Sequence, residues 1–88
     1  MTIAYQISYE CGEYTHTDIL EVSTNYDEIE RLYHQFLGEC MMDVQIGNNS
    51  VDYICIETFN CEIDEDGNID PIDDDYEVTL EYVINEPV

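Results

Sequence analysis

The side chains most able to do chemistry lie in residues 61–77, CEIDEDGNIDPIDDDYE, which contain nine Asp and Glu residues and no basic residue. Carboxylates this closely spaced can coordinate a hard cation through their oxygens, or they can meet a positively charged surface. They can also act as acid–base pairs, but among 22 carboxylates in the chain no particular pair stands out. The stretch therefore predicts a metal site or a binding surface, and it identifies no catalytic residue.

The centre of the stretch, DEDGNID, resembles the calcium loop of EF-hand and dockerin proteins. The resemblance places Gly67 at the invariant glycine position of that loop and uses the backbone carbonyl of Asn68 as a ligand. The calcium ligands that it implies are Glu62, Asp64, Asp66, Asn68, Asp70 and Asp73. A calcium-binding module built on residues 62–73 is therefore one alternative for the function.

The flanks of this loop depart from the calcium pattern. The first ligand position holds Glu62 rather than Asp, and the last holds Asp73, one methylene shorter than the usual bidentate Glu. An EF-hand loop lies between two helices, whereas strand-like patterns flank this one. Because Asp-Gly and Gly-Asn are strong turn signals, the same residues also fit an acidic turn between two strands.

Net charge separates this chain from ordinary soluble domains. Its 88 residues include 22 Asp and Glu but a single Lys or Arg, which is Arg31, so the net charge is −21. Small soluble domains usually carry a net charge of about 2–8. Repulsion at the higher density opposes folding, which indicates that the excess serves a function. The same charge repels nucleic acids and phosphorylated substrates, so we expect no direct nucleic-acid binding.

The remaining reactive residues form no motif. The four cysteines and two histidines lack CxxC spacing and zinc-ligand spacing, and the chain has no glycine-rich phosphate loop. The sequence also lacks a signal-peptide pattern and any run near the roughly 18 apolar residues of a membrane span. We therefore expect a cytoplasmic protein that is not an enzyme, has reduced thiols, needs no cofactor and does not contact a membrane.

Hydropathy periods predict the elements that position the acidic stretch. Residues 3–11 and 14–22 alternate as two strands of a hairpin, and residues 51–63 and 76–84 read as two further strands. In the first strand, Ala4, Gln6 and Ser8 fall on the face predicted to point outward. The last strand is predicted to point the following residues inward: Tyr76, Val78, Leu80, Tyr82 and Ile84.

Between the strand pairs the period changes to that of a helix. The residues on its apolar face are Ile29, Leu32, Tyr33, Phe36, Leu37, Cys40 and Met41. Asn25 with Glu28 fits a capping arrangement, and Asp27 with Arg31 has the spacing of an i,i+4 ion pair. The pattern allows the helix to end at Gly38 or to run on to Met42.

These elements predict an α+β fold with the order β-β-α-β-β. The four strands form an antiparallel sheet, and the helix packs on one apolar face of that sheet. Length and pattern predict a single domain that spans residues 1–88.

The uncompensated charge predicts a basic protein surface as the partner. The commonest basic surfaces in a cell bind nucleic acids. Side chains on one face of a strand recur about every 6.8 Å, a scale comparable with the repeat of phosphates along a nucleic-acid strand. The predicted function is non-enzymatic inhibition, in which the protein binds the nucleic-acid-binding surface of a basic protein and blocks DNA binding. The expected contact residues are Glu65, Asp66, Asp70, Asp73, Asp74, Asp75 and Glu77.

In size, single-domain α+β organisation and near-absence of Lys and Arg, the chain resembles the small acidic DNA-mimic inhibitors of phages and mobile elements. This class includes anti-CRISPR proteins, antirestriction proteins and the uracil-DNA glycosylase inhibitor. Its members share no common motif, so the resemblance assigns no residue. It implies a stoichiometric protein partner, which is a nuclease, a CRISPR effector, or a restriction or repair enzyme, and it implies the host-cell cytoplasm and no cofactor. The second alternative is a protein adapted to high salt, whose acidity serves hydration.

Overall fold

The computed structural model describes residues 2–11, 16–45 and 51–84, and it confirms the predicted α+β class and β-β-α-β-β order. Residues 14–15 of the predicted second strand lie outside the described residues. The elements in chain order are β1 (Thr2–Cys11), β2 (His16–Ser23), α1 (Tyr26–Gln45), β3 (Val51–Ile63), β4 (Ile69–Pro71) and β5 (Glu77–Val83). The short strand β4 lies within the acidic stretch and was not predicted.

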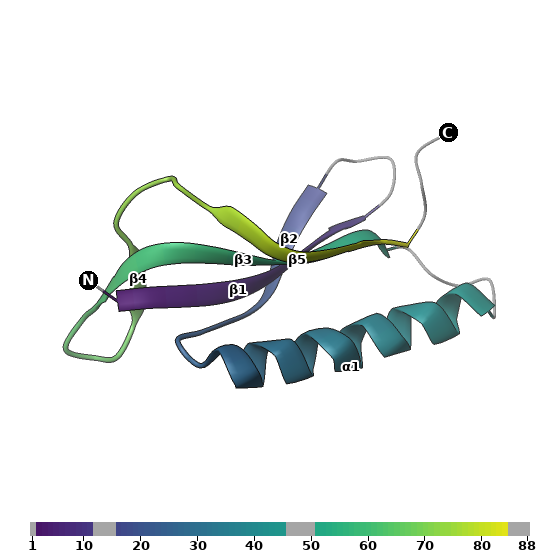
Figure 1. Ribbon diagram of the computed structural model, residues 1–88, viewed down its shortest axis with the longest axis horizontal. Coiled ribbons are helices and arrows are strands. Elements are labelled where there is room, and N and C mark those ends of the chain that lie inside the picture. The colour runs from purple at the N-terminus through teal and green to yellow at the C-terminus, as the bar shows by residue number, and fades with distance from the viewer. Residues whose placement is uncertain (1, 12–15, 46–50, 85–88) are drawn as a thin grey trace.

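All strand pairs are antiparallel, and β3 is the strand that connects the two halves of the sheet. The order is β2-β1-β3-β4, with β5 also paired to β3. One edge of β3 pairs with β1, so its other edge is divided: β5 pairs with Tyr53–Thr58 and β4 with Cys61–Ile63. Thirteen extended residues span about 43 Å, close to the 44 Å long axis of the molecule. Figure 1 shows this long, curled sheet lying along one side of α1.

The main core forms between α1 and the sheet. Its fully buried members are Ile7, Ile29, Tyr33, Ile54 and Ile56. Around them, Tyr5 packs edge-on against Tyr26, and Tyr9 packs against Phe36, with ring centroids 5.1 and 5.3 Å apart. Because aromatic rings bury a large apolar area and pair in preferred geometries, they suit a small domain that must hold together against its own charge.

The predicted cap of α1 is confirmed: the backbone N–H of Glu28 donates to Asn25 Oδ1 at 3.2 Å. The helix runs through Gly38 to Gln45, beyond both predicted ends. Met41, predicted on the buried face, is exposed near the end of the helix. Among the described residues, no helix is long and apolar enough to cross a membrane.

Over β1 and much of β3, the face of the sheet opposite α1 is also buried, contrary to the prediction for the first strand. Ala4 is fully buried there with Phe59 and Cys61. Gln6 and Ser8 are only 8% and 4% exposed, and both side chains donate to Glu57 Oε1, at 3.2 and 2.7 Å. Ala4, Gln6 and Ser8 lie on β1, between β2 and β3. Because antiparallel sheets twist and this sheet curls, the strands on either side of β1 shield these residues from solvent.

The predicted inward face of the last strand is wrong in part, because a bulge interrupts β5. The register with β3 shifts between Ile56 and Glu57. A bulge adds one residue to one strand and so reverses which face its alternate residues occupy. On one side of the shift, Leu80 packs on the α1 core. On the other, Tyr76 packs on Phe59, on the opposite face of the sheet.

The packing predicts different responses to one small substitution at two strand positions. Ile54 is fully buried, whereas Ile19 is 55% exposed. We expect Ile54→Val to lower the free energy of unfolding by about 0.5–1.5 kcal/mol, because it removes a core methylene. Ile19→Val keeps a β-branched strand residue and is expected to change it by less than about 0.5 kcal/mol. Urea denaturation measures both, and equal effects would contradict the assignment of the core.

Candidate acidic binding surface

A tight turn joins β3 to β4 and contains the residues that resemble a calcium loop. The backbone N–H of Gly67 donates to the carbonyl of Asp64, and the N–H of Asp64 donates to the carbonyl of Asn68, both at 3.1 Å. Gly67 has φ +85°, a left-handed conformation that L side chains rarely adopt. A tight turn followed by a left-handed glycine is a common three-residue hairpin connection. Gly67 therefore serves to reverse the chain.

The Asp64 carboxylate holds this turn together. Its Oδ1 accepts the backbone N–H groups of Asp66 and Asn68, both at 2.9 Å, and its Oδ2 accepts the side-chain amide of Asn68 at 3.2 Å. These hydrogen bonds, led by the Asn68 backbone N–H, lower the pKa of Asp64 below its ordinary value of 3.8. This candidate calcium ligand thus has both of its carboxylate oxygens engaged within the turn.

The other calcium candidates follow the hairpin. Glu62 and Asp70 lie directly opposite each other on β3 and β4, and Asp73 lies beyond the end of β4. The described part of the chain contains no group of three or more His, Cys, Asp or Glu side chains placed to hold a metal ion. Calcium binding remains a separate hypothesis, which calorimetric titration of the protein and of Asp64→Asn/Asp66→Asn can test.

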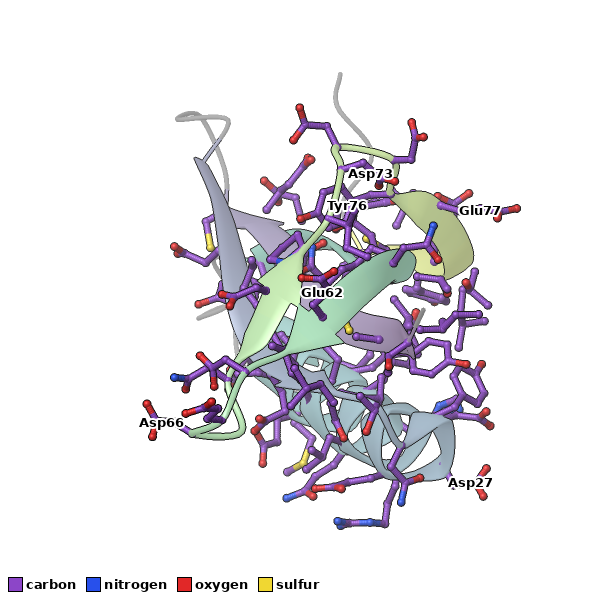
Figure 2. The ribbon with its side chains drawn as sticks, turned by 90° about the vertical axis from the view of Figure 1, so that its left-hand side faces the viewer. Asp27, Glu62, Asp66, Asp73, Tyr76 and Glu77 are labelled. Carbon is purple, nitrogen blue, oxygen red and sulfur yellow. The ribbon has the colours of Figure 1, made fainter. Side chains whose placement is uncertain are left out.

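All seven predicted contact residues are exposed, but the structure does not gather them into one cluster. They lie in the β3–β4 turn, on β4, in the loop of residues 72–76 and at the first residue of β5. Figure 2, which views this end of the molecule, shows Asp66 and Asp73 far apart at its margins, with Glu77 on a third side. We call these seven residues the acidic end: Glu65, Asp66, Asp70, Asp73, Asp74, Asp75 and Glu77.

The loop of residues 72–76 projects three consecutive aspartates from the sheet. At the start of the loop, the backbone N–H of Ile72 donates to the carbonyl of Asn60 on β3 at 3.0 Å. Asp73 Oδ1 accepts the backbone N–H of Asp75 at 3.1 Å, which tightens the loop. Tyr76 then returns to the sheet and packs on Phe59. Both ends of the loop therefore contact β3, and the three aspartates between them are exposed to solvent.

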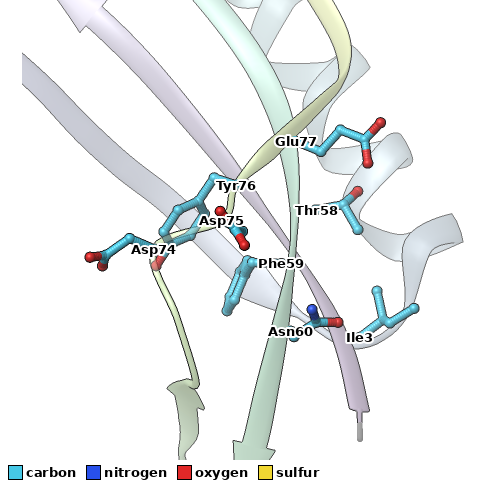
Figure 3. A pocket seen from close by; sticks show the side chains of 8 residues that line it. All are labelled: Ile3, Thr58, Phe59, Asn60, Asp74, Asp75, Tyr76 and Glu77. Atoms are coloured by element: carbon cyan, nitrogen blue, oxygen red, sulfur yellow. The ribbon is translucent and has the colours of Figure 1, made fainter.

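A pocket of about 370 Å³ lies between this loop and β3 (Figure 3). Its lining consists of Ile3 of β1, Thr58, Phe59 and Asn60 of β3, Asp74, Asp75 and Tyr76 of the loop, and Glu77 of β5. Sequence reasoning selected the acids but missed Phe59, Asn60 and Tyr76. The sequence feature that could have indicated the pocket is the aromatic residue directly after three aspartates. The alternation of the last strand instead assigned that residue, Tyr76, to the main core.

Positive charge gives this surface little compensation. Among the described residues no ion pair joins Asp27 to Arg31, and His34 Nε2 lies 3.8 Å from Glu30 Oε1, a contact that is ionic only when the imidazole is protonated. Exposed helix pairs are worth only about 0.3–0.5 kcal/mol, too little to fix two long side chains. Within the ranges that the structure describes, no residue of the acidic end has a cation within ion-pair distance. Its carboxylates therefore face solvent uncompensated.

The thiols show packing rather than reactivity. Cys40, Cys55 and Cys61 are buried, and Cys11 is half-buried. Burial is the main cause that raises the pKa of the Cys11, Cys40 and Cys55 thiols above the ordinary value. The thiolate is the nucleophilic form, so these environments suppress nucleophilic chemistry at neutral pH.

Comparison with known protein families, with curated protein sequences and with solved structures finds no match to this chain. The surface is therefore interpreted from its own geometry and charge.

The turn predicts that Asp64 and Asp66 differ in their contribution to stability. Asp64→Ala removes three hydrogen bonds and is expected to lower Tm by a few degrees. Asp66→Ala changes the charge equally but leaves those acceptors in place, so Tm should stay the same or rise slightly.

The effect of Asp64 also has a predicted pH dependence. Folding depresses the pKa of this carboxyl below 3.8, so its stabilisation is complete at neutral pH and is lost as pH falls through the folded-state value. The difference in Tm between wild type and Asp64→Ala should therefore shrink below about pH 4. Thermal melts from pH 7 to pH 2.5 test this, and a difference that grows in acid would contradict the role of Asp64.

Proposed function

We propose that this protein is a non-enzymatic inhibitor that binds the positively charged nucleic-acid-binding surface of a nuclease or CRISPR effector and blocks its binding to DNA. The observation that carries the proposal is the linear density of negative charge. The long axis of 44 Å divided by 21 net charges gives about one charge per 2.1 Å. Counting only the described residues, with 20 carboxylates and one arginine, gives about 2.3 Å. Duplex DNA carries one charge per about 1.7 Å of its axis.

Shape supports the same interpretation. The molecule is elongated, with dimensions of 44 × 23 × 21 Å, so its charge is spread along a rod rather than over a sphere. Asp70 stands on β4 and Glu77 on β5, and Asp73 and Asp75 stand on the loop between these strands, so exposed carboxylates continue from one element to the next. A basic groove that accommodates phosphates along a duplex would meet a comparable density of negative groups.

The energetics favour association with a cationic partner. The exposed carboxylates of the acidic end have no competing ion pair among the described residues. Dense uncompensated charge speeds the encounter with an oppositely charged surface and makes affinity depend steeply on salt. Occupation of a DNA groove needs no catalytic residue or cofactor. The partner class is thus a basic nucleic-acid-binding protein, namely a nuclease, a CRISPR effector, or a restriction or repair enzyme, and the site of action is the cytoplasm.

Affinity capture at two salt concentrations identifies the partner. Immobilised protein is incubated with lysate from cells that carry CRISPR or restriction systems, and the retained proteins are identified by mass spectrometry. The proposal requires a nucleic-acid-binding protein that is retained at low or moderate salt and released at high salt. If none is retained at low or moderate salt, the proposal is wrong.

Once the partner is identified, two triple variants of equal net charge test whether the acidic end is the contact surface. Asp73→Asn/Asp74→Asn/Asp75→Asn neutralises the loop, whereas Glu28→Gln/Glu39→Gln/Asp43→Asn neutralises three exposed carboxylates on α1. We expect the loop variant to weaken binding on the order of tenfold at moderate salt and to flatten the salt dependence. The α1 variant should have a much smaller effect. Equal losses of affinity in the two variants would contradict the acidic end as the contact and would indicate that binding depends on overall charge alone.

A further inference from the structure

The pocket beside the loop of residues 72–76 arises because two strands share one edge of β3. β5 leaves that edge at Thr58, and β4 occupies it from Cys61. Between these points the chain detours outward, anchored by the Ile72–Asn60 hydrogen bond. The detour leaves a cavity of about 370 Å³ against Phe59 and Asn60. The cavity is thus a consequence of sheet topology, not of a chance arrangement of surface side chains.

Two aromatic rings form an apolar wall in this cavity. Phe59 is 3% exposed and belongs to the second core cluster with Ala4 and Cys61, so its position is fixed. Tyr76 packs on it with ring centroids 5.1 Å apart and an interplanar angle of 41°. Because Tyr76 is 37% exposed, part of it remains accessible to a ligand. The wall is therefore preorganised and still open to solvent.

Polar groups complete the pocket, and none of them carries positive charge. The carboxylates are those of Asp74, Asp75 and Glu77, and Figure 3 shows Asp74 and Glu77 on opposite sides of the Phe59–Tyr76 pair. Thr58 and Asn60, which flank Phe59 along β3 and belong to the other face of the sheet, line the edge of the pocket with neutral polar groups, and the Thr58 hydroxyl is paired with that of Thr79. A ligand with an extended apolar stem and a cationic, multiply donating head complements both the rings and the acceptors.

We propose that this pocket receives an arginine side chain of the basic partner, an inference that rests on the proposed function. A guanidinium is planar, so it can stack on an aromatic face while its N–H groups donate to carboxylates. It is also less strongly hydrated than an ammonium group and loses less on leaving water. The cavity falls within the roughly 300–1,000 Å³ range of small-ligand pockets, enough for this head and its stem. Arginine is among the residues that concentrate binding energy at the centre of interfaces.

Hexa-arginine and hexa-lysine peptides of equal charge separate this recognition from general electrostatics. Titration of the whole chain at low salt, followed by NMR, should show both peptides binding, with hexa-arginine about two- to fivefold tighter. The aromatic resonances of Phe59 and Tyr76 should shift with hexa-arginine more than with hexa-lysine.

Two tyrosines on one segment provide a matched pair of variants. Tyr76→Leu keeps an apolar side chain and every charge but removes the aromatic face, so it should abolish the preference for arginine and leave hexa-lysine binding unchanged. Tyr82→Leu alters a tyrosine of similar exposure that does not line the pocket, and it should keep the preference. Circular dichroism verifies that each variant is folded.

The outcomes distinguish the pocket from the function on which it rests. Equal affinity for both peptides in the wild type overturns the arginine pocket, and so does a preference for arginine that persists in folded Tyr76→Leu. Neither result contradicts the proposed inhibitor function. If neither peptide binds at low salt, the proposed function fails as well. Should Tyr76→Leu not fold, the wild-type ring shifts decide, and their absence with hexa-arginine overturns the pocket.

Discussion

Repulsion among 22 carboxylates, opposed by a single arginine, is the constraint on which the rest of this structure depends. The chain meets it by burying isoleucine and tyrosine between α1 and the sheet and by packing a second cluster on the opposite face. Carboxylates that lie near these cores accept hydrogen bonds from neutral groups, as Glu57 does from Gln6 and Ser8. The remaining carboxylates stay in water, where screening limits their cost. Folding thus leaves a surface of uncompensated negative charge on the sheet and its connecting loops.

The pairing of strand β3 determines where part of this negative charge is presented. It runs the length of the molecule, and its outer edge is divided between β4 and β5. The chain that passes from one to the other must leave the sheet, and it does so where three aspartates follow one another. The same detour presents the aspartates to solvent and opens the pocket against Phe59. The three aspartates of this loop and the pocket beside them therefore have one topological origin.

Sequence patterns predicted those parts of the fold that depend on local period and turn chemistry. Alternation identified the strands, the 3.6-residue period identified α1, and the Asp-Gly signal identified the turn at Gly67. The bulge at Ile56/Glu57 left no such signal, because it depends on how two strands fit together. Without it, Tyr76 was assigned to the wrong face, and the pocket was missed. The burial of Gln6 and Ser8 escaped prediction for a related reason, since a curl of the sheet is a property of all its strands.

The central claim is that the acidic surface occupies the place of DNA on a basic protein. The most direct test is a competition experiment in which the captured partner is first saturated with a fluorescent DNA duplex. The protein is then titrated in, while fluorescence anisotropy and analytical ultracentrifugation follow the bound species. The account predicts stoichiometric release of the duplex, with an apparent affinity that falls as salt rises. A stable ternary complex of partner, duplex and protein would contradict it.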